Sequence, residues 1–162
     1  MTWIEPTALD RQRIMRESKT VAIVGASDNP ARASFFVATY LLSSSNFKLF
    51  FVNPRLETLL GHPVYKSLAD IPEQVDIVDV FRKPADIPGI LDEAIAICAK
   101  TLWLQLGLSV PEVAAAGSKA GLSVVMNRCL KIEHARFHGG LHLAGFNTGV
   151  ISSARNAKKG GS

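Results

Sequence analysis

The segment Val21–Asn29 reads VAIVGASDN, an apolar run that ends in a glycine and continues as a small polar turn. The residues just beyond it, PARASFF, can open a helix. A buried strand that runs into a glycine turn and a helix N-terminus forms a phosphate-binding unit, because the helix start presents free N–H groups and a favourable dipole. Of the dinucleotide pattern G-x-G-x-x-G only the first glycine, Gly25, is present, which argues against an ordinary NAD site. The turn therefore predicts a site for a nucleotide-like anion other than NAD.

Further apolar runs alternate with helical patterns along the chain. Strands that alternate with helices form parallel sheets with right-handed crossovers, and continuous apolar runs fit strands buried on both faces. We therefore predict an α/β fold, an open parallel sheet of about five strands with helices on both faces. The expected strands are Val21–Val24, Phe47–Val52, Val75–Val80, Thr101–Gln105 and Leu122–Met126. The expected helices are Thr7–Glu17, Ala33–Leu42 (with Phe36, Val37, Tyr40 and Leu41 on one face), Ala85–Ala99 and Val110–Ala120, and residues 56–71 are expected to be a connection.

Length and composition indicate a globular protein with one main domain. The 162 residues are 48% hydrophobic and 20% charged, which suits a full core. We expect a helical lead at 1–17, the main domain at 18–136, and a C-terminal extension at 137–162 whose end is mobile. The formal net charge of +4 mildly favours anionic partners and is too small to indicate nucleic-acid binding.

The cysteine count and the N-terminus bear on location. Two cysteines, Cys98 and Cys129, cannot form a disulfide framework, which fits a reducing compartment. The N-terminus lacks the apolar segment of a signal peptide, and no apolar stretch approaches the ~20 residues that cross a membrane. We therefore expect a cytoplasmic protein with no membrane partner.

The residues that follow each strand are the candidates for ligand binding, because ligands of open parallel sheets bind beyond the carboxyl ends of the strands. Four of the five strand ends supply an arginine, and guanidinium groups fork onto phosphate oxygens. A ligand with several separated phosphates would suit this edge. The candidates are Gly25, Ala26, Ser27 and Arg32 after the first strand, Asn53, Pro54 and Arg55 after the second, Phe81 and Arg82 after the third, Gln105 and Gly107 after the fourth, and Asn127, Arg128 and Cys129 after the fifth.

The end of the second expected strand differs from that of an NAD-binding protein. An NAD site has Asp or Glu there to hold the ribose 2′-hydroxyl. This chain has Asn53 instead, with Arg55 close by. An arginine suits a phosphorylated ribose, which NADP and coenzyme A (CoA) both contain. NADP would still need the missing glycines.

Five blocks of the sequence resemble the bacterial single-domain CoA-binding proteins of the succinyl-CoA synthetase α-type Rossmann family. The blocks are VAIVGASDNPARAS, FFVNPR, VDIVDVFRKP, AKTLWLQLGL and GLSVVMNRC. They occur in order over residues 18–134, each at an expected strand end, which makes the resemblance more specific than a single glycine motif. The resemblance implies a CoA-binding Rossmann domain at 18–136 with CoA as its ligand.

The same resemblance implies roles for the strand-end residues. Residues 25–27 would form the phosphate turn, residues 53–55 would flank the 3′-phosphate of the adenosine, and residues 81–82 would bound the adenine or pantetheine path. Asn127 stands where the family has an aspartate, which leaves a neutral hydrogen-bonding group there. The implied CoA-binding residues are Gly25, Ala26, Ser27, Arg32, Ser34, Asn53, Pro54, Arg55, Phe81, Arg82, Gln105, Gly107 and Asn127.

Other chemically active side chains give weaker candidates. Cys129 is the plausible nucleophile near the groove, since neighbouring cations activate a thiol, although cysteine is also an ordinary small buried residue. His134, His138 and His142 have the spacing of one helix face, but Gly139-Gly140 would interrupt that helix, so no metal site is expected.

Four further residues are assigned to the fold rather than to chemistry. Cys98 and Trp103 are expected in the core. Asp76 and Asp79 lie within an expected buried strand without an obvious partner, and we expect no acid–base pair and no catalytic residue from them.

The function that follows from these observations is binding of CoA or an acyl-CoA by a module that is non-catalytic on its own. A CoA ligase α subunit uses a second domain with a phosphorylated histidine, for which this chain leaves no room. Two alternatives stay open: an NADP- or CoA-dependent enzyme completed by an oligomer partner, and an interaction protein with a vestigial groove. A homo-oligomer or an unidentified protein partner is compatible with each of them.

Overall fold

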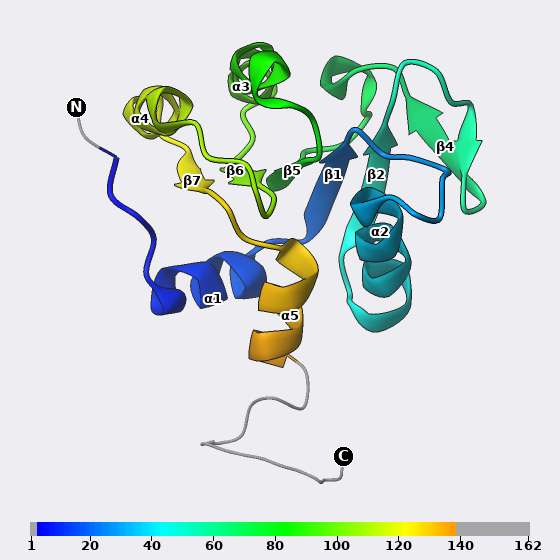
Figure 1. The fold of residues 1–162 in the computed structure, drawn as a ribbon, viewed down its shortest axis with the longest axis horizontal. Coiled ribbons are helices and arrows are strands. Elements are labelled where there is room, and N and C mark those ends of the chain that lie inside the picture. Colours follow the sequence, from blue (N-terminus) through cyan, green and yellow to red (C-terminus); the bar gives the residue numbers. More distant parts are fainter. Residues whose placement is uncertain (1–2, 139–162) are drawn as a thin grey trace, which may run out of the picture. The chain divides into compact units, whose positions relative to one another are not determined.

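The computed structural model describes residues 3–138 of the chain (Figure 1). Contacts divide the chain after Cys129 into two compact units, which are described separately. The strands are β1 Thr20–Val24, β2 Lys48–Val52, β3 Thr58–Leu59, β4 His62–Tyr65, β5 Ile77–Val80, β6 Thr101–Leu104 and β7 Ser123–Val125. The α-helices are α1 Ala8–Glu17, α2 Ala33–Ser44, α3 Ile87–Ala96, α4 Pro111–Lys119 and α5 Leu130–His138, and the 3-10 helices are η1 Leu68–Asp70 and η2 Pro84–Asp86.

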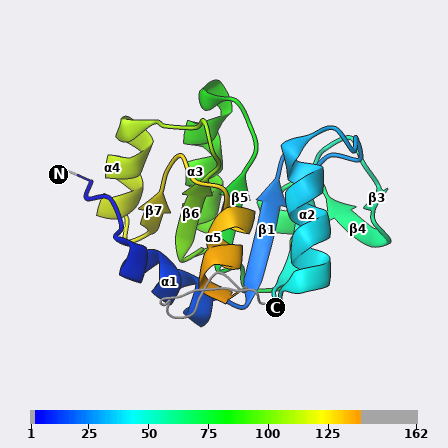
Figure 2. The same ribbon diagram turned by 60° about the horizontal axis from the view of Figure 1, so that its bottom comes forward.

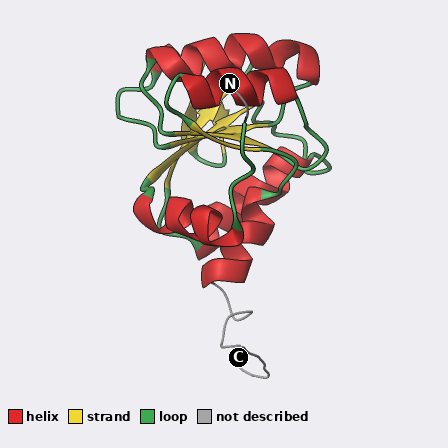
Figure 3. Cartoon of the chain, turned by 90° about the vertical axis from the view of Figure 1, so that its left-hand side faces the viewer, coloured by secondary structure: helices red, strands yellow, loops and turns green. Residues whose placement is uncertain are grey.

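The strands of the first unit form one seven-stranded sheet in the order β3-β4-β2-β1-β5-β6-β7. Neighbouring strands are parallel except for the antiparallel pair β3 and β4. Helices α3 and α4 cover one face of the sheet, and α1 and α2 lie on the other (Figures 1 and 2). Figure 3 shows the strands edge-on, with helices on both sides. This arrangement confirms the predicted Rossmann-like α/β fold, and the sheet has two more strands than the five expected.

The central strands are buried on both faces, as their unbroken apolar sequences predict. On β1, Ala22 and Val24 join the core formed with α3 and α4, while Val21 and Ile23 are equally buried. Trp103 is fully buried, as expected. Because a buried indole N–H needs a partner, its bond to the Arg128 carbonyl at 2.8 Å fixes the chain just after β7.

The two additional strands lie in the segment that was expected to be a connection. β4 pairs with β2, and the rings of Phe51 and His62 meet edge-to-face with centroids 5.9 Å apart. The hairpin between β3 and β4 turns through Leu60 and Gly61, whose positive φ values of 51° and 80° are those that a two-residue hairpin favours. β3 has two residues, and β4 has four residues and contains Pro63. Neither strand has the apolar run that predicts the other five.

Two expectations about the helices are wrong in detail. Helix α3 ends at Ala96, so Cys98 lies beyond it with φ 59° and is exposed, not in the core. On α2, Val37 and Leu41 are buried, but Phe36 is 55% exposed. Phe36 precedes Val37 by one residue and therefore points about 100° away from it around the helix axis.

In the second unit, α5 occupies a region in which the sequence showed no clear helical period. Glu133 and Arg136 form an ion pair one turn apart along it, at 3.4 Å. His134 and His138 thus fall on one helix, whereas His142 and the expected mobile end lie outside the described residues. Within residues 3–138 no three His, Cys, Asp or Glu side chains come together as a metal site requires.

Asp79 is a fully buried carboxyl group on β5 to which neither oxygen has a hydrogen-bond partner. Its neighbours in register are Ile23 and Trp103. Burial raises the pKa of the Asp79 carboxyl well above its usual range, because the ionised form loses its hydration. Asp76, in contrast, accepts the backbone N–H of Lys19 at 2.7 Å, so the expectation that it lacks a partner is wrong.

We predict that Asp79→Asn becomes more stable relative to the wild type as the pH rises. In the unfolded chain this carboxyl titrates near ~3.9. Above that pH the unfolded state releases a proton that the folded state still holds, so wild-type stability falls until the raised folded pKa is passed. Urea unfolding between about pH 4 and about pH 8 measures the difference in unfolding free energy, with exposed Asp28→Asn as a control for net charge. A difference that does not change with pH would contradict the assignment.

Candidate functional site

The turn after β1 is built against the turn after β5. Gly25 has φ +89°, a left-handed conformation that glycine adopts readily. Its N–H donates to the Val52 carbonyl at 3.0 Å, and the Phe81 N–H donates to the Val24 carbonyl at 2.8 Å. A Cβ at Gly25 would lie 2.6 Å from the Phe81 carbonyl oxygen and 2.9 Å from Cδ of Arg82. The neighbouring backbone alone therefore demands glycine at this position.

The polar loop between β1 and α2 is held by its own side chains. The Ser27 hydroxyl accepts the Asn29 N–H at 3.0 Å, and the Asn29 side-chain oxygen accepts the Ala31 N–H at 3.0 Å. Arg32 is the N-cap residue of α2 and supplies no side-chain cap bond, although its backbone carbonyl accepts the Phe35 N–H at 3.1 Å. Ser34, in the first turn, is buried.

Asn53 joins the loops at the ends of three neighbouring strands. Its side-chain N–H donates to the Ala26 carbonyl at 2.7 Å, and its side-chain oxygen accepts the Arg55 N–H at 2.7 Å. Its backbone N–H donates to the Tyr65 carbonyl at the end of β4, at 3.0 Å. Asn53 thus sets the position of the β1 turn relative to the chain that follows β2 and β4.

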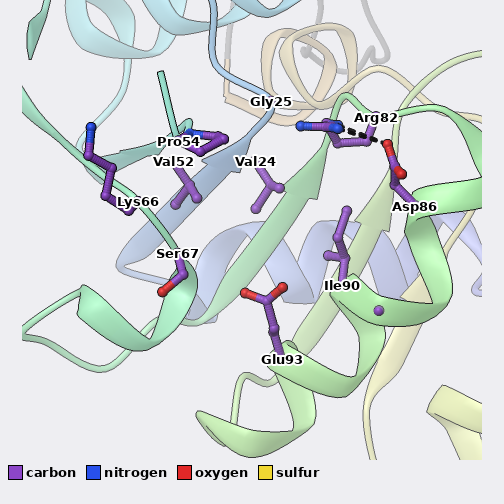
Figure 4. Close-up of a pocket in the computed structure, with 11 residues that line it drawn as sticks. Val24, Gly25, Val52, Pro54, Lys66, Ser67, Arg82, Asp86, Ile90 and Glu93 are labelled. Carbon is purple, nitrogen blue, oxygen red and sulfur yellow. Dashed lines mark hydrogen bonds and ion pairs between the residues drawn. The ribbon is translucent and has the colours of Figure 1, made fainter. Parts of the chain in front are cut away.

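A cavity of about 290 Å³ opens between these strand ends and α3 (Figure 4). Val24, Val52 and Ile90 supply its apolar wall, and Figure 4 shows Ile90 and Glu93 pointing into it from α3. Its lining residues are Val24, Gly25, Val52, Pro54, Lys66, Ser67, Arg82, Asp86, Gly89, Ile90 and Glu93.

The charges around the cavity are already arranged by contacts within the protein. Arg82 binds Asp86 through Nε and Nη2, at 3.2 and 2.8 Å from one carboxylate oxygen. Lys66 lies 3.4 Å from the Glu57 carboxylate in an exposed pair of small energetic weight. Glu93 accepts the Leu68 N–H at 3.4 Å and so connects α3 to η1. The cavity lining therefore combines an apolar wall with two cations, Lys66 and Arg82, and two carboxylates, Asp86 and Glu93.

Three of the predicted binding residues line this cavity, namely Gly25, Pro54 and Arg82. Sequence reasoning missed Lys66, Ser67 and the α3 side chains, because the first two follow β4, which was not predicted. The predicted residues outside the lining are Ala26, Ser34 and Gln105, which are buried, and Ser27, Arg32, Asn53, Arg55, Phe81, Gly107 and Asn127, which are exposed or half-buried.

The far end of the same sheet edge is also held together by an asparagine. Asn127 has φ 59°, and its side-chain oxygen accepts the Gly107 N–H at 2.7 Å, which fixes the loop after β6. The next residue, Arg128, pairs with Glu5 at 3.2 Å. Cys129 is half-buried and free. The predicted arginines therefore do not form one continuous rim, since Arg128 has a separate partner from the N-terminal lead.

Comparison with known proteins places these features in a family context. A family model described as "CoA binding domain" matches residues 19–135. A Bacillus subtilis protein named "Uncharacterized protein YneT" is 33% identical over 130 residues, which are 80% of this chain and 96% of that protein. The ADP-forming acetate–CoA ligase II of Archaeoglobus fulgidus is 29% identical over 141 residues, which are 85% of this chain and 19% of the ligase.

Solved structures of small proteins are also similar to this chain. A hypothetical protein from Pyrococcus horikoshii is similar with a TM-score of 0.76 and 35% identity, over 85% of this chain and 99% of that one. A version of the protein PH1109 redesigned for binding has a TM-score of 0.78 and 38% identity, over 82% and 93% of the two chains. Within residues 3–138, no helix has the length and apolar character needed to cross a membrane.

We predict that Gly25→Ala destabilises the protein even without ligand, and by more than the matched substitution Gly61→Ala. Both glycines have positive φ, so each alanine costs about 1–2 kcal/mol for the left-handed conformation. A Cβ at Gly61 meets nothing within 4 Å, whereas at Gly25 it meets the Phe81 backbone and adds about 1–3 kcal/mol. Urea denaturation of both variants measures the difference. Equal losses would mean that the turns at Gly25 and Phe81 do not approach closely in solution.

Proposed function

The chain belongs to the CoA binding domain family, and from this we propose that it binds CoA or an acyl-CoA along the carboxyl edge of its sheet. The family match bears out the resemblance drawn from the five sequence blocks. The observation that carries the proposal is the cavity at the ends of β1 and β2, where an apolar wall, a glycine turn and two cations meet.

The adenine would lie in the cavity against the apolar wall. Val24, Val52 and Ile90 offer a surface without charge, and Pro54 closes one side. The volume of about 290 Å³ is at the lower end of the roughly 300–1,000 Å³ of small-molecule sites. The cavity therefore holds one part of a CoA molecule, and the rest would extend over the neighbouring strand ends.

The phosphates would bind at the turn and at the cations around it. Gly25 lets this turn close against Phe81, and the start of α2, which has no side-chain cap bond, presents N–H groups nearby. The Asp86 contacts of Arg82 use Nε and Nη2, which leaves Nη1 for a phosphate oxygen. Arg55 follows β2 and Lys66 follows the neighbouring strand β4. We assign both side chains to the 3′-phosphate.

We predict that CoA binds about ten- to a hundred-fold more tightly than dephospho-CoA. The reason is that a hydrogen bond to a charged group, here the 3′-phosphate, contributes about 1.5–3 kcal/mol. The double variant Arg55→Gln/Lys66→Gln should lose most of this preference. Lys48→Gln, at the opposite end of β2, is the matched control and should keep it. Isothermal titration calorimetry measures all three proteins, with NADP as a further ligand because it also carries a ribose phosphate.

Equal affinities for CoA and dephospho-CoA in the wild type would contradict the assignment of the 3′-phosphate. Binding of NADP in preference to CoA would favour the alternative of an NADP-dependent protein. Binding of neither ligand would favour an interaction protein whose groove is vestigial.

We also propose that the chain alone performs no chemical step on the bound ligand. The matched region covers only 19% of the ADP-forming ligase that this chain resembles. A cytoplasmic location, and assembly with itself or with another protein, stay predictions from the sequence.

The test of this second proposal is incubation with acetyl-CoA, followed by measurement of free thiol. We expect acetyl-CoA to be recovered intact at the uncatalysed rate, for the wild type and for Cys129→Ser alike. Protein-dependent thiol release that disappears in the serine variant would make Cys129 a nucleophile and the protein an enzyme.

A further inference from the structure

A second cavity, of about 300 Å³, lies on the same edge of the sheet at the end of β7. The Trp3 and Glu5 side chains of the N-terminal lead form one side of it. The other side comes from the chain before α4 and the chain after β7. Its lining residues are Trp3, Glu5, Ser109, Met126, Asn127 and Arg128.

The walls of this cavity are fixed by hydrogen bonds to neighbouring elements. The indole N–H of Trp3 donates to the Val124 carbonyl at 2.9 Å, which anchors the N-terminal lead to β7. The backbone of Arg128 is held on both sides by β6, through a bond to the Leu104 carbonyl and a bond from the Trp103 indole. The guanidinium of Arg128 thus projects from an anchored position rather than from a free loop.

The Arg128 guanidinium in this cavity can exchange its ion-pair partner, Glu5, for another anion. Arg128 contacts Glu5 at 3.2 Å, and the two side chains are 34% and 61% exposed. Pairs with this exposure contribute little to stability, so a ligand anion can replace the Glu5 carboxylate at small cost. A guanidinium binds a carboxylate through two parallel hydrogen bonds, so a second carboxylate can take the place of that of Glu5.

The two cavities lie on one row of neighbouring strand ends. The strands β1, β5, β6 and β7 are neighbours in that order, so the ends of β1 and β7 are three spacings, or roughly 14 Å, apart. With the adenine at β1 and β2 and the pyrophosphate at the Gly25 turn, the pantetheine arm of an extended CoA would cross the ends of β5 and β6. Its thiol end would then reach the cavity at β7.

We propose that this second cavity receives the acyl group of a bound acyl-CoA and selects a short acyl group that ends in a carboxylate. The inference rests on the proposed CoA binding. In the complex, Arg128 exchanges the Glu5 carboxylate for that of the acyl group, and Ser109 and Asn127 supply further polar surface. A long alkyl chain finds no apolar channel in this lining.

The test compares succinyl-CoA with butyryl-CoA, which has the same chain length without the terminal carboxylate. For the wild type, we expect succinyl-CoA to bind about tenfold more tightly than butyryl-CoA in calorimetry. Arg128→Gln should reduce this ratio to about one. Glu5→Gln should raise it, because the carboxylate that competes for Arg128 is removed.

Free CoA is also titrated into each protein, so that a failure of the proposed CoA binding can be distinguished from a failure of the proposed acyl-group site. If wild type does not bind free CoA, the proposed function fails. If it binds free CoA but shows no preference for succinyl-CoA, or if Glu5→Gln weakens succinyl-CoA binding, the inference about the second cavity is overturned. Glu5→Gln removes only one exposed ion pair, so we expect this variant to fold. Its succinyl-CoA affinity therefore tests the inference even if Arg128→Gln does not fold.

Discussion

The close approach of two backbone turns is the contact on which the candidate site depends. Parallel strands β1 and β5 end side by side, and Gly25 lies so near the Phe81 carbonyl that no side chain fits between them. This contact brings Arg82 next to the turn, from where it and Asp86 line the cavity. The strand ends thereby form a polar edge at whose centre the glycine turn and the Arg82 side chain lie side by side.

Two asparagines arrange the remainder of the edge. Asn53 holds the β1 turn through the Ala26 carbonyl, and Asn127 holds the β6 loop through the Gly107 N–H. Both follow a strand, and both satisfy backbone groups that the turning chain would otherwise leave unpaired. The sequence predicts these asparagines as ligand contacts, and the structure gives each a positioning bond at one end of the edge. Between these two asparagines lie the ends of β1, β5 and β6.

The sequence predicts the central part of the fold well, because buried parallel strands require long apolar runs and such runs are easily recognised. It also predicts the glycine turn, for which the strand-to-helix transition is a clear local signal. Short edge strands are different. β3 and β4 are stabilised by pairing with β2 and by ring contacts such as that of Phe51 with His62, which no local pattern encodes.

The errors at the site follow from the errors in the fold. Lys66 and Ser67 line the cavity because β4 ends beside β2, so they could not be predicted without that strand. The prediction of Cys98 in the core assumes that the helical period of α3 continues past Ala96, where the helix ends. The partner of Arg128 is Glu5, more than a hundred residues away in sequence, and only the folded lead brings them together.

The central claim is that CoA binds with its adenine in the cavity at β1 and β2 and its arm across β5 and β6. A crystal structure of the protein grown with CoA tests this most directly. The account predicts adenine density against Val24, Val52 and Ile90, pyrophosphate density at the Gly25 turn, and the thiol directed toward Arg128. Adenine density at the β7 cavity, or CoA bound away from the carboxyl edge of the sheet, would contradict it.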